Sequence, residues 1–168
     1  MARLKLTGVD EGLSTMISTK ITGADHPEII LEAIQTLFPE FNCGLPKEPR
    51  FPTDSNDMIA AENIPLDGFL DALHSQRILD TALDAMSRNL DPSGTMFEIS
   101  RQALMAGKVA FPLPGETPLG GVVVIEIGGQ NLGDWLEAAT WHAGRETIPR
   151  HIGDELQMEE DGESSTWH

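Results

Sequence analysis

The sequence has little positive charge and almost no cysteine. Of 168 residues, 11 are Lys or Arg and 27 are Asp or Glu, so the formal net charge at pH 7 is −16. Cys43 is the single cysteine, which excludes an internal disulfide and a thiolate metal cluster. No apolar run approaches the roughly 18 residues of a membrane span, and the N-terminus lacks the apolar core of a signal peptide. These absences predict a cytoplasmic protein with no membrane partner.

Two explanations fit the excess of acid. A compact domain with such a charge repels itself, and molar salt shortens the Debye length from about 8–10 Å to about 3 Å and so screens the repulsion. The acids are spread along the whole chain, which favours a halophilic surface, adapted to a salt-rich cytoplasm. The alternative is a basic partner, such as a cationic protein face. DNA is not expected as a partner, because affinity for phosphate rests on Lys and Arg.

Hydrophobic spacing predicts both strands and helices. From Thr15 to Thr22 the residues alternate, with Ile17, Thr19 and Ile21 on one face and the residues between them on the other, which indicates a half-buried strand. Further strands are expected at 58–61, 95–100, 108–111 and 122–127. The last should be central in the sheet, buried on both faces or on one face and at a dimer contact, because its apolar run is unbroken. Helices are expected at 25–38, at 65–74, at 75–90 and after residue 131.

Local signals predict where these helices begin. Asp25 is expected to cap the first helix, with Glu28 three residues later as in a capping box and Pro27 tolerated in the first turn. The apolar stripe changes phase near residue 75, so two helices are expected to meet at Ser75, a suitable cap. Asn131 is expected to cap the last helix.

The resulting order, β-α-β-α-α-β-β-β-α, predicts an α+β fold with helices on one face of a largely antiparallel sheet. We expect residues 1–13 to be an N-terminal extension, residues 14–144 a single domain, and residues 145–168 an acidic tail that is disordered from about residue 153. That tail holds two Arg and seven acids.

One stretch resembles a known family. The string Gln-Arg-Ile-Leu-Asp-Thr-Ala at 76–82 is its most specific part, followed by Phe-Glu-Ile-Ser-Arg-Gln-Ala-Leu-Met-Ala-Gly-Lys-Val at 97–109 and Leu-Gly-Gly-Val at 119–122. With the Asp-His-Pro-Glu run at 25–28, residues 15–128 are similar to the uncharacterised archaeal protein family numbered 0201. The resemblance implies a fold similar to large-subunit ribosomal protein five and an archaeal, even haloarchaeal, source. The family has no established activity, so the resemblance supplies no catalytic residues.

The best candidate for a ligand site is a small set of basic and amide residues. A cation there could bind a phosphate of RNA, whereas the structural alternative is that each residue anchors a turn or pairs with a carboxylate, as Arg77 could with Asp80 three residues later. The candidate RNA- or ligand-binding residues are Arg77, Arg88, Arg101, Gln102 and Lys108.

Recognisable catalytic patterns are absent from the sequence. None of the five histidines has metal-ligand spacing, no Gly-x-Ser-x-Gly elbow occurs, and the glycines at 115–121 lack the ending of a phosphate loop. We therefore expect no metal and no cofactor. The sequence favours a non-catalytic interaction module, a homodimer that binds protein or RNA. The alternatives are an enzyme with a site near Arg77, Asp80, Arg101 and Lys108, and an assembly protein whose acidic tail docks on a basic partner.

Overall fold

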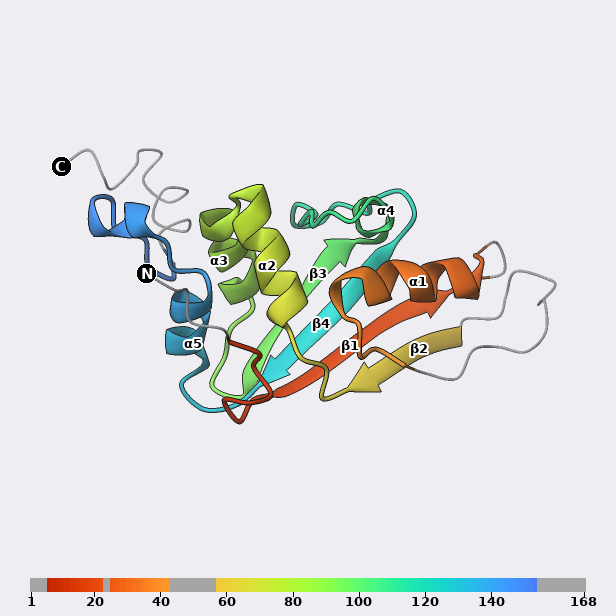
Figure 1. Ribbon diagram of the computed structural model, residues 1–168, viewed down its shortest axis with the longest axis horizontal. Coiled ribbons are helices and arrows are strands. Elements are labelled where there is room, and N and C mark those ends of the chain that lie inside the picture. The colour runs from red at the N-terminus through yellow and green to blue at the C-terminus, as the bar shows by residue number, and fades with distance from the viewer. Residues whose placement is uncertain (1–5, 23–24, 43–56, 154–168) are drawn as a thin grey trace.

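The computed structural model describes residues 6–22, 25–42 and 57–153. Its centre is an antiparallel four-stranded sheet in the order β2-β1-β4-β3. The strands are β1 (Ser14–Ile21), β2 (Asp57–Glu62), β3 (Gly94–Ser100) and β4 (Val122–Gly128). The helices are α1 (Pro27–Leu37), α2 (Asp67–Gln76), α3 (Leu79–Ser87), α4 (Arg101–Met105), α5 (Leu132–Ala139) and the short 3₁₀ helix η1 (Ala143–Glu146) (Figure 1). The predicted α+β class is confirmed.

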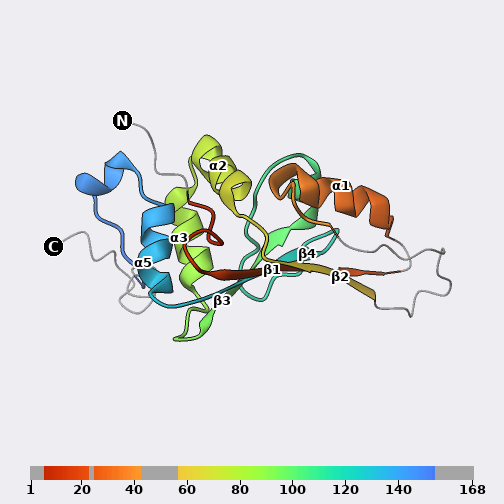
Figure 2. The same ribbon diagram turned by 60° about the horizontal axis from the view of Figure 1, so that its bottom comes forward.

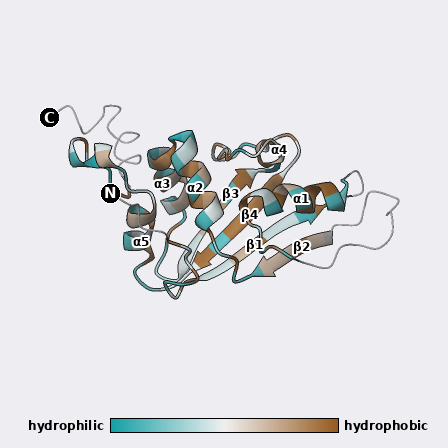
Figure 3. Ribbon diagram, in the orientation of Figure 1, coloured by the Kyte–Doolittle hydropathy of each residue, from teal (hydrophilic) through white to brown (hydrophobic). Residues whose placement is uncertain are grey.

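The helices lie on one side of the sheet. Figure 2 shows the sheet nearly edge-on, with α1 and α2 above it. Alternation within each strand directs one set of side chains toward those helices, and Ile17, Phe97 and Ile125 are buried there. Each helix carries hydrophobic and hydrophilic residues together (Figure 3), as expected for an element with one packed face. The apolar set of each strand therefore packs under the helices.

Aromatic rings connect the helices to the sheet. Phe69 of α2 stacks on Phe38 at 5.8 Å between ring centroids and on Phe97 of β3 at 6.0 Å, and Phe111 meets Phe69 edge-on at 6.5 Å. The first turn of α2 approaches the end of α1 closely, because a Cβ added at Gly68 would lie 2.4 Å from the Leu37 carbonyl oxygen. Only glycine fits this contact.

Three local expectations were wrong. Residues 108–111 form no strand. The Val109 backbone N–H and C=O bond the Gln76 side chain instead of a neighbouring strand, and the Ala110 carbonyl accepts from the Ser100 N–H. Asp25 does not cap α1, whose N-cap is His26. Ser75 lies inside α2, and the helix break comes at Arg77, which adopts the left-handed conformation (φ 58°).

Both ends of the described chain pack on this framework. In residues 6–13, the Thr7 carbonyl accepts from the Leu66 N–H at 2.9 Å, and Glu11 accepts from the Trp135 indole N–H at 2.8 Å. The tail was expected to be disordered from about residue 153, and residues 154–168 of it lie outside the described residues. No helix in the described part of the chain is long and apolar enough to cross a membrane.

Candidate interaction surface

The second face of the sheet carries no described helix. Alternation directs to it the residues that lie between the buried ones, and we call this set the open sheet face. Met58 and Met96 are 59% and 46% exposed, and Met16, Val122 and Val124 are half-buried. The open sheet face consists of Met16, Ser18, Lys20, Met58, Ala60, Glu62, Met96, Glu98, Val122, Val124 and Glu126.

Strand register arranges four of these residues in one row across the sheet. Met16 pairs with Glu62 of β2 on one side and with Glu126 of β4 on the other, and Glu126 in turn pairs with Met96 of β3. All four line a shallow hollow of about 710 Å³ at this end of the sheet. The lining also includes Asp91 and the amides of Asn63 and Asn89, so the hollow combines thioethers, carboxylates and amides.

The five candidate ligand residues do not form one patch. Arg77 sits at the left-handed link between α2 and α3, and Arg88 follows α3 at its other end. Gln102 and Lys108 are exposed on and after α4, while Arg101 is buried beside Gln102. The link from Gln76 to Val109 brings Arg77 and Lys108 into the same region. Arg88 lies apart from them, and so the structure gathers only part of the set.

Arg101 is enclosed by internal partners. Its side chain is 8% exposed and pairs with Asp25 at 3.1 Å. Its Nη1 donates to the Thr19 hydroxyl at 3.0 Å and to the Lys20 carbonyl at 2.6 Å, and the guanidinium lies against Gly121, within 3.3 Å of the position a Cβ would take. Burial alone would raise the pKa of Asp25, but hydrogen bonds from Thr22 and the Arg101 charge outweigh it and lower that pKa. Arg101 thus joins β1, the β1–α1 link and the start of β4.

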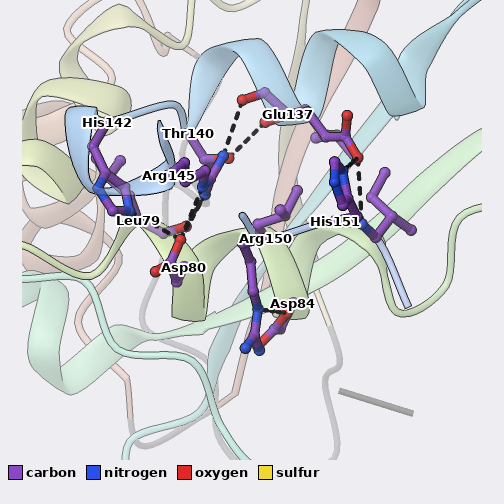
Figure 4. A network of polar contacts seen from close by, with 12 residues as sticks. Leu79, Asp80, Asp84, Glu137, Thr140, His142, Arg145, Arg150 and His151 are labelled. Carbon is purple, nitrogen blue, oxygen red and sulfur yellow. Dashed lines mark hydrogen bonds and ion pairs between the residues drawn. The ribbon is translucent and has the colours of Figure 1, made fainter. Parts of the chain in front are cut away.

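Asp80 has a different partner from the one expected. It accepts from Arg145 Nε at 3.0 Å and lies 3.0 Å from His142 Nε2 (Figure 4), so its predicted pairing with Arg77 is replaced. Arg145 is buried, 5% exposed at its side chain, and also donates to the Glu137 carbonyl at 3.2 Å. Asp80 therefore holds residues 142–145 against α3.

We call residues 140–152 the C-terminal segment. Two further contacts attach its last three residues, 150–152. Arg150 forms an ion pair with Asp84 of α3, and the Ile152 N–H donates to Glu137 of α5 at 3.3 Å. A hollow of about 380 Å³ lies between this segment and α5, lined by Trp141, Arg145, Arg150, Asp134 and Glu137 among others. Its charges are balanced and its arginines already have carboxylate partners, so this region serves to hold the segment in place.

Replacing Asp80 with asparagine is expected to lower the free energy of unfolding by about 1–3 kcal/mol at pH 7, because the buried Arg145 loses its carboxylate partner. Burial would raise the pKa of Asp80, but hydrogen bonds from His142 and Arg145 outweigh it and lower that pKa below its ordinary value of 3.8. A carboxyl whose pKa is lower in the folded than in the unfolded chain stabilises the fold at pH values above its pKa in the unfolded chain. This stabilisation is lost as the pH falls through its pKa in the folded chain.

The difference between wild type and Asp80→Asn should therefore be present above about pH 5 and close below about pH 4. Urea unfolding followed by tryptophan fluorescence measures it. Asp134→Asn, an exposed change on α5 that removes the same charge, is the control. A loss of equal size in both variants would mean that Asp80 does no more than contribute surface charge.

The described residues contain no group of three or more His, Cys, Asp or Glu side chains positioned to hold a metal ion. Neither of the two hollows described above is lined by Arg77, Asp80, Arg101 or Lys108.

Comparison with solved structures defines the class of fold. The chain is similar to an uncharacterised UPF0201 protein, with 20% identity and a TM-score of 0.60 over 74% of this chain and 90% of that one. A UPF0201 protein from Methanococcus jannaschii gives 18% identity and a TM-score of 0.64, over 78% and 96% of the two chains. A DUF54 protein from Methanothermobacter thermautotrophicus gives 12% and 0.51, over 80% and 93%. No family model and no curated protein matches the sequence.

These similarities establish the fold: the chain has the α+β architecture of the UPF0201 and DUF54 proteins. They extend over nearly the full length of those proteins. The further likeness to large-subunit ribosomal protein five stays a prediction.

Proposed function

We propose that this chain is a non-catalytic interaction module that binds a protein through its open sheet face. The observation that carries the proposal is the set of apolar side chains on a face without a described covering layer, in particular Met58, Met96 and Val124. Exposed apolar side chains on one face of a sheet favour association, because their burial removes them from water. Methionine side chains are flexible and adapt to differently shaped partners.

RNA binding receives less support than protein binding. Proteins that bind single-stranded RNA on a sheet stack its bases on aromatic side chains, and the open sheet face has Met, Val and Glu at its positions. Arg77 and Lys108 are exposed in one region, but Arg101 makes internal bonds. The support for RNA is therefore the resemblance to a ribosomal-protein fold, and fold alone is weak evidence of function.

The fold and the local sequence resemblance together support membership of the archaeal family numbered 0201. The Gln-Arg-Ile-Leu-Asp-Thr-Ala string covers the α2–α3 link, where Arg77 takes its left-handed conformation. The acid excess also extends to the described residues, of which seven are Lys or Arg and 19 are Asp or Glu. Exposed acids lie on α1, β2, β3 and β4 alike. This spread supports a halophilic source and a cytoplasmic location for the protein.

Site-specific photo-crosslinking in the native cells tests the binding surface. A benzophenone amino acid replaces Met96, on the open sheet face, or Met105, which is 57% exposed on α4. We expect a discrete protein adduct from position 96 and none from position 105, and the same adduct from Met58, which is 59% exposed on β2. Adducts of equal yield at 96 and 105, no adduct at 96, or an RNA adduct would each contradict the proposal.

A further inference from the structure

We infer that the open sheet face binds a cationic, amphipathic protein segment, which is held by the row Glu62, Met16, Glu126 and Met96. The inference rests on the proposed function and adds the chemistry of the partner. Its basis is the juxtaposition of carboxylates and thioethers across the four strands.

The row has a defined spacing. Neighbouring strands lie about 4.8 Å apart, so Glu62 on β2 and Glu126 on β4 are separated by about 10 Å, with Met16 of β1 between them. In a helical partner, residues seven positions apart are about 10.5 Å apart on one face, and the residues three and four positions along lie between them. Two Lys or Arg at that spacing can pair with the two carboxylates while an apolar residue contacts Met16.

Charge complementarity favours this occupant over a second copy and over the acidic tail. Glu62, Glu98 and Glu126 are exposed on the face, and Lys20 is the single basic residue among its described members. A second copy packed face to face would bring like charges together, and such contacts oppose association. The chain's own residues 154–168 hold six acids and no Lys or Arg, so they are repelled as well. A cationic segment gains from the same charges.

The apolar part of the row prevents the contact from being purely electrostatic. Met96 is 46% exposed and Met16 half-buried, so a partner must present an apolar strip beside its cations to remove both from water. A polycation without that strip should bind weakly. This requirement separates recognition from the general attraction that a protein of charge −16 exerts on any cation.

A designed probe tests the inference. The probe is a fluorescent helical peptide with two Lys seven positions apart and Leu three and four positions after the first, compared with a peptide of the same composition in scrambled order. Binding is measured by fluorescence anisotropy at the lowest KCl concentration at which the protein stays folded, because salt also screens the ion pairs under test. The patterned peptide should bind at least about tenfold more tightly than the scrambled one, because only it contacts both the carboxylates and the methionines.

Charge-reversal variants locate the site. Glu62→Lys combined with Glu126→Lys should weaken binding of the patterned peptide by about tenfold or more. Glu28→Lys combined with Glu32→Lys changes the net charge equally on the exposed face of α1 and should change binding by less than about twofold. A patterned peptide with Glu in place of Lys should bind the first variant more tightly than wild type, and this gain of affinity cannot come from misfolding.

The outcomes separate this inference from the proposed function. Equal losses in the two double variants, or equal binding of the two Lys peptides, would overturn the inference. So would a crosslinked partner at Met96 that is a second copy of this chain or that lacks a basic segment, although the face would then still bind a protein. Failure of the proposed function requires the different result given above, the absence of a specific protein adduct at that face.

Discussion

Replacing Arg101 with methionine is expected to lower the free energy of unfolding by about 3–5 kcal/mol, the range found when one partner of a buried ion pair is removed. The guanidinium connects three parts of the fold, through Asp25, the Thr19 hydroxyl and the Lys20 carbonyl. Methionine has a similar length but no donor. The variant therefore leaves these acceptors without their guanidinium partner in a region that water reaches poorly.

The neighbouring residue provides a matched control for this prediction. Gln102 lies on the same helix and is exposed, so Gln102→Met should change the free energy of unfolding by less than about 0.5 kcal/mol. Urea unfolding followed by tryptophan fluorescence, at one KCl concentration, compares the two. If Arg101→Met were as stable as Gln102→Met, the ion pair with Asp25 would contribute nothing to the fold and Arg101 would be available for a ligand.

The sequence predicted the strands better than the helix ends. Alternation identified β1 and placed Ile17 and Thr19 on the covered face, because strand orientation is set by a local period of two residues. The capping prediction at Asp25 failed because its carboxylate has other partners, one of them far along the chain. Its carboxylate accepts from the Thr22 N–H and pairs with Arg101, which lies 76 residues further along the chain.

Arg101 and Arg145 are both buried, and neither burial was predicted from the sequence. Phe97 and Ile99 of the strand predicted at 95–100 alternate with Glu98 and are buried. Arg101, two residues after Ile99, is buried on the same side although it already belongs to α4. That alternation was present in the sequence. By contrast, nothing local indicates that Arg145 is buried against α3, since its partner Asp80 is 65 residues away.

The open sheet face was predicted only in part. The alternation of β1 placed Met16, Ser18 and Lys20 together on one face, and this is observed. The row through Glu62, Glu126 and Met96 depends on the register between strands, which the sequence does not specify for chain segments this far apart. The candidate binding surface is consequently a property of the fold more than of any motif.

Transfer from about 3 M to about 0.1 M KCl is expected to lower the free energy of unfolding by roughly 5 kcal/mol and Tm by roughly 10–20 °C. Neighbouring like charges each destabilise a fold by about 0.2–0.5 kcal/mol, and the chain carries an excess of 16 negative charges over which these terms accumulate. Molar salt reduces the Debye length to about 3 Å and largely removes them. Thermal unfolding followed by circular dichroism across a KCl series measures the effect.

Two controls separate screening from a general effect of cosolute on burial. Sucrose favours burial without screening charge, so it should restore less stability in dilute buffer than KCl does. Changing the exposed residues Glu28, Glu32 and Glu40 to glutamine removes three negative charges from the region of α1, so it should raise stability at low salt and flatten the KCl dependence. A chain that stays folded and monodisperse when KCl is withdrawn would not need salt. The acid excess would then be better explained by the cationic partner inferred for the open sheet face.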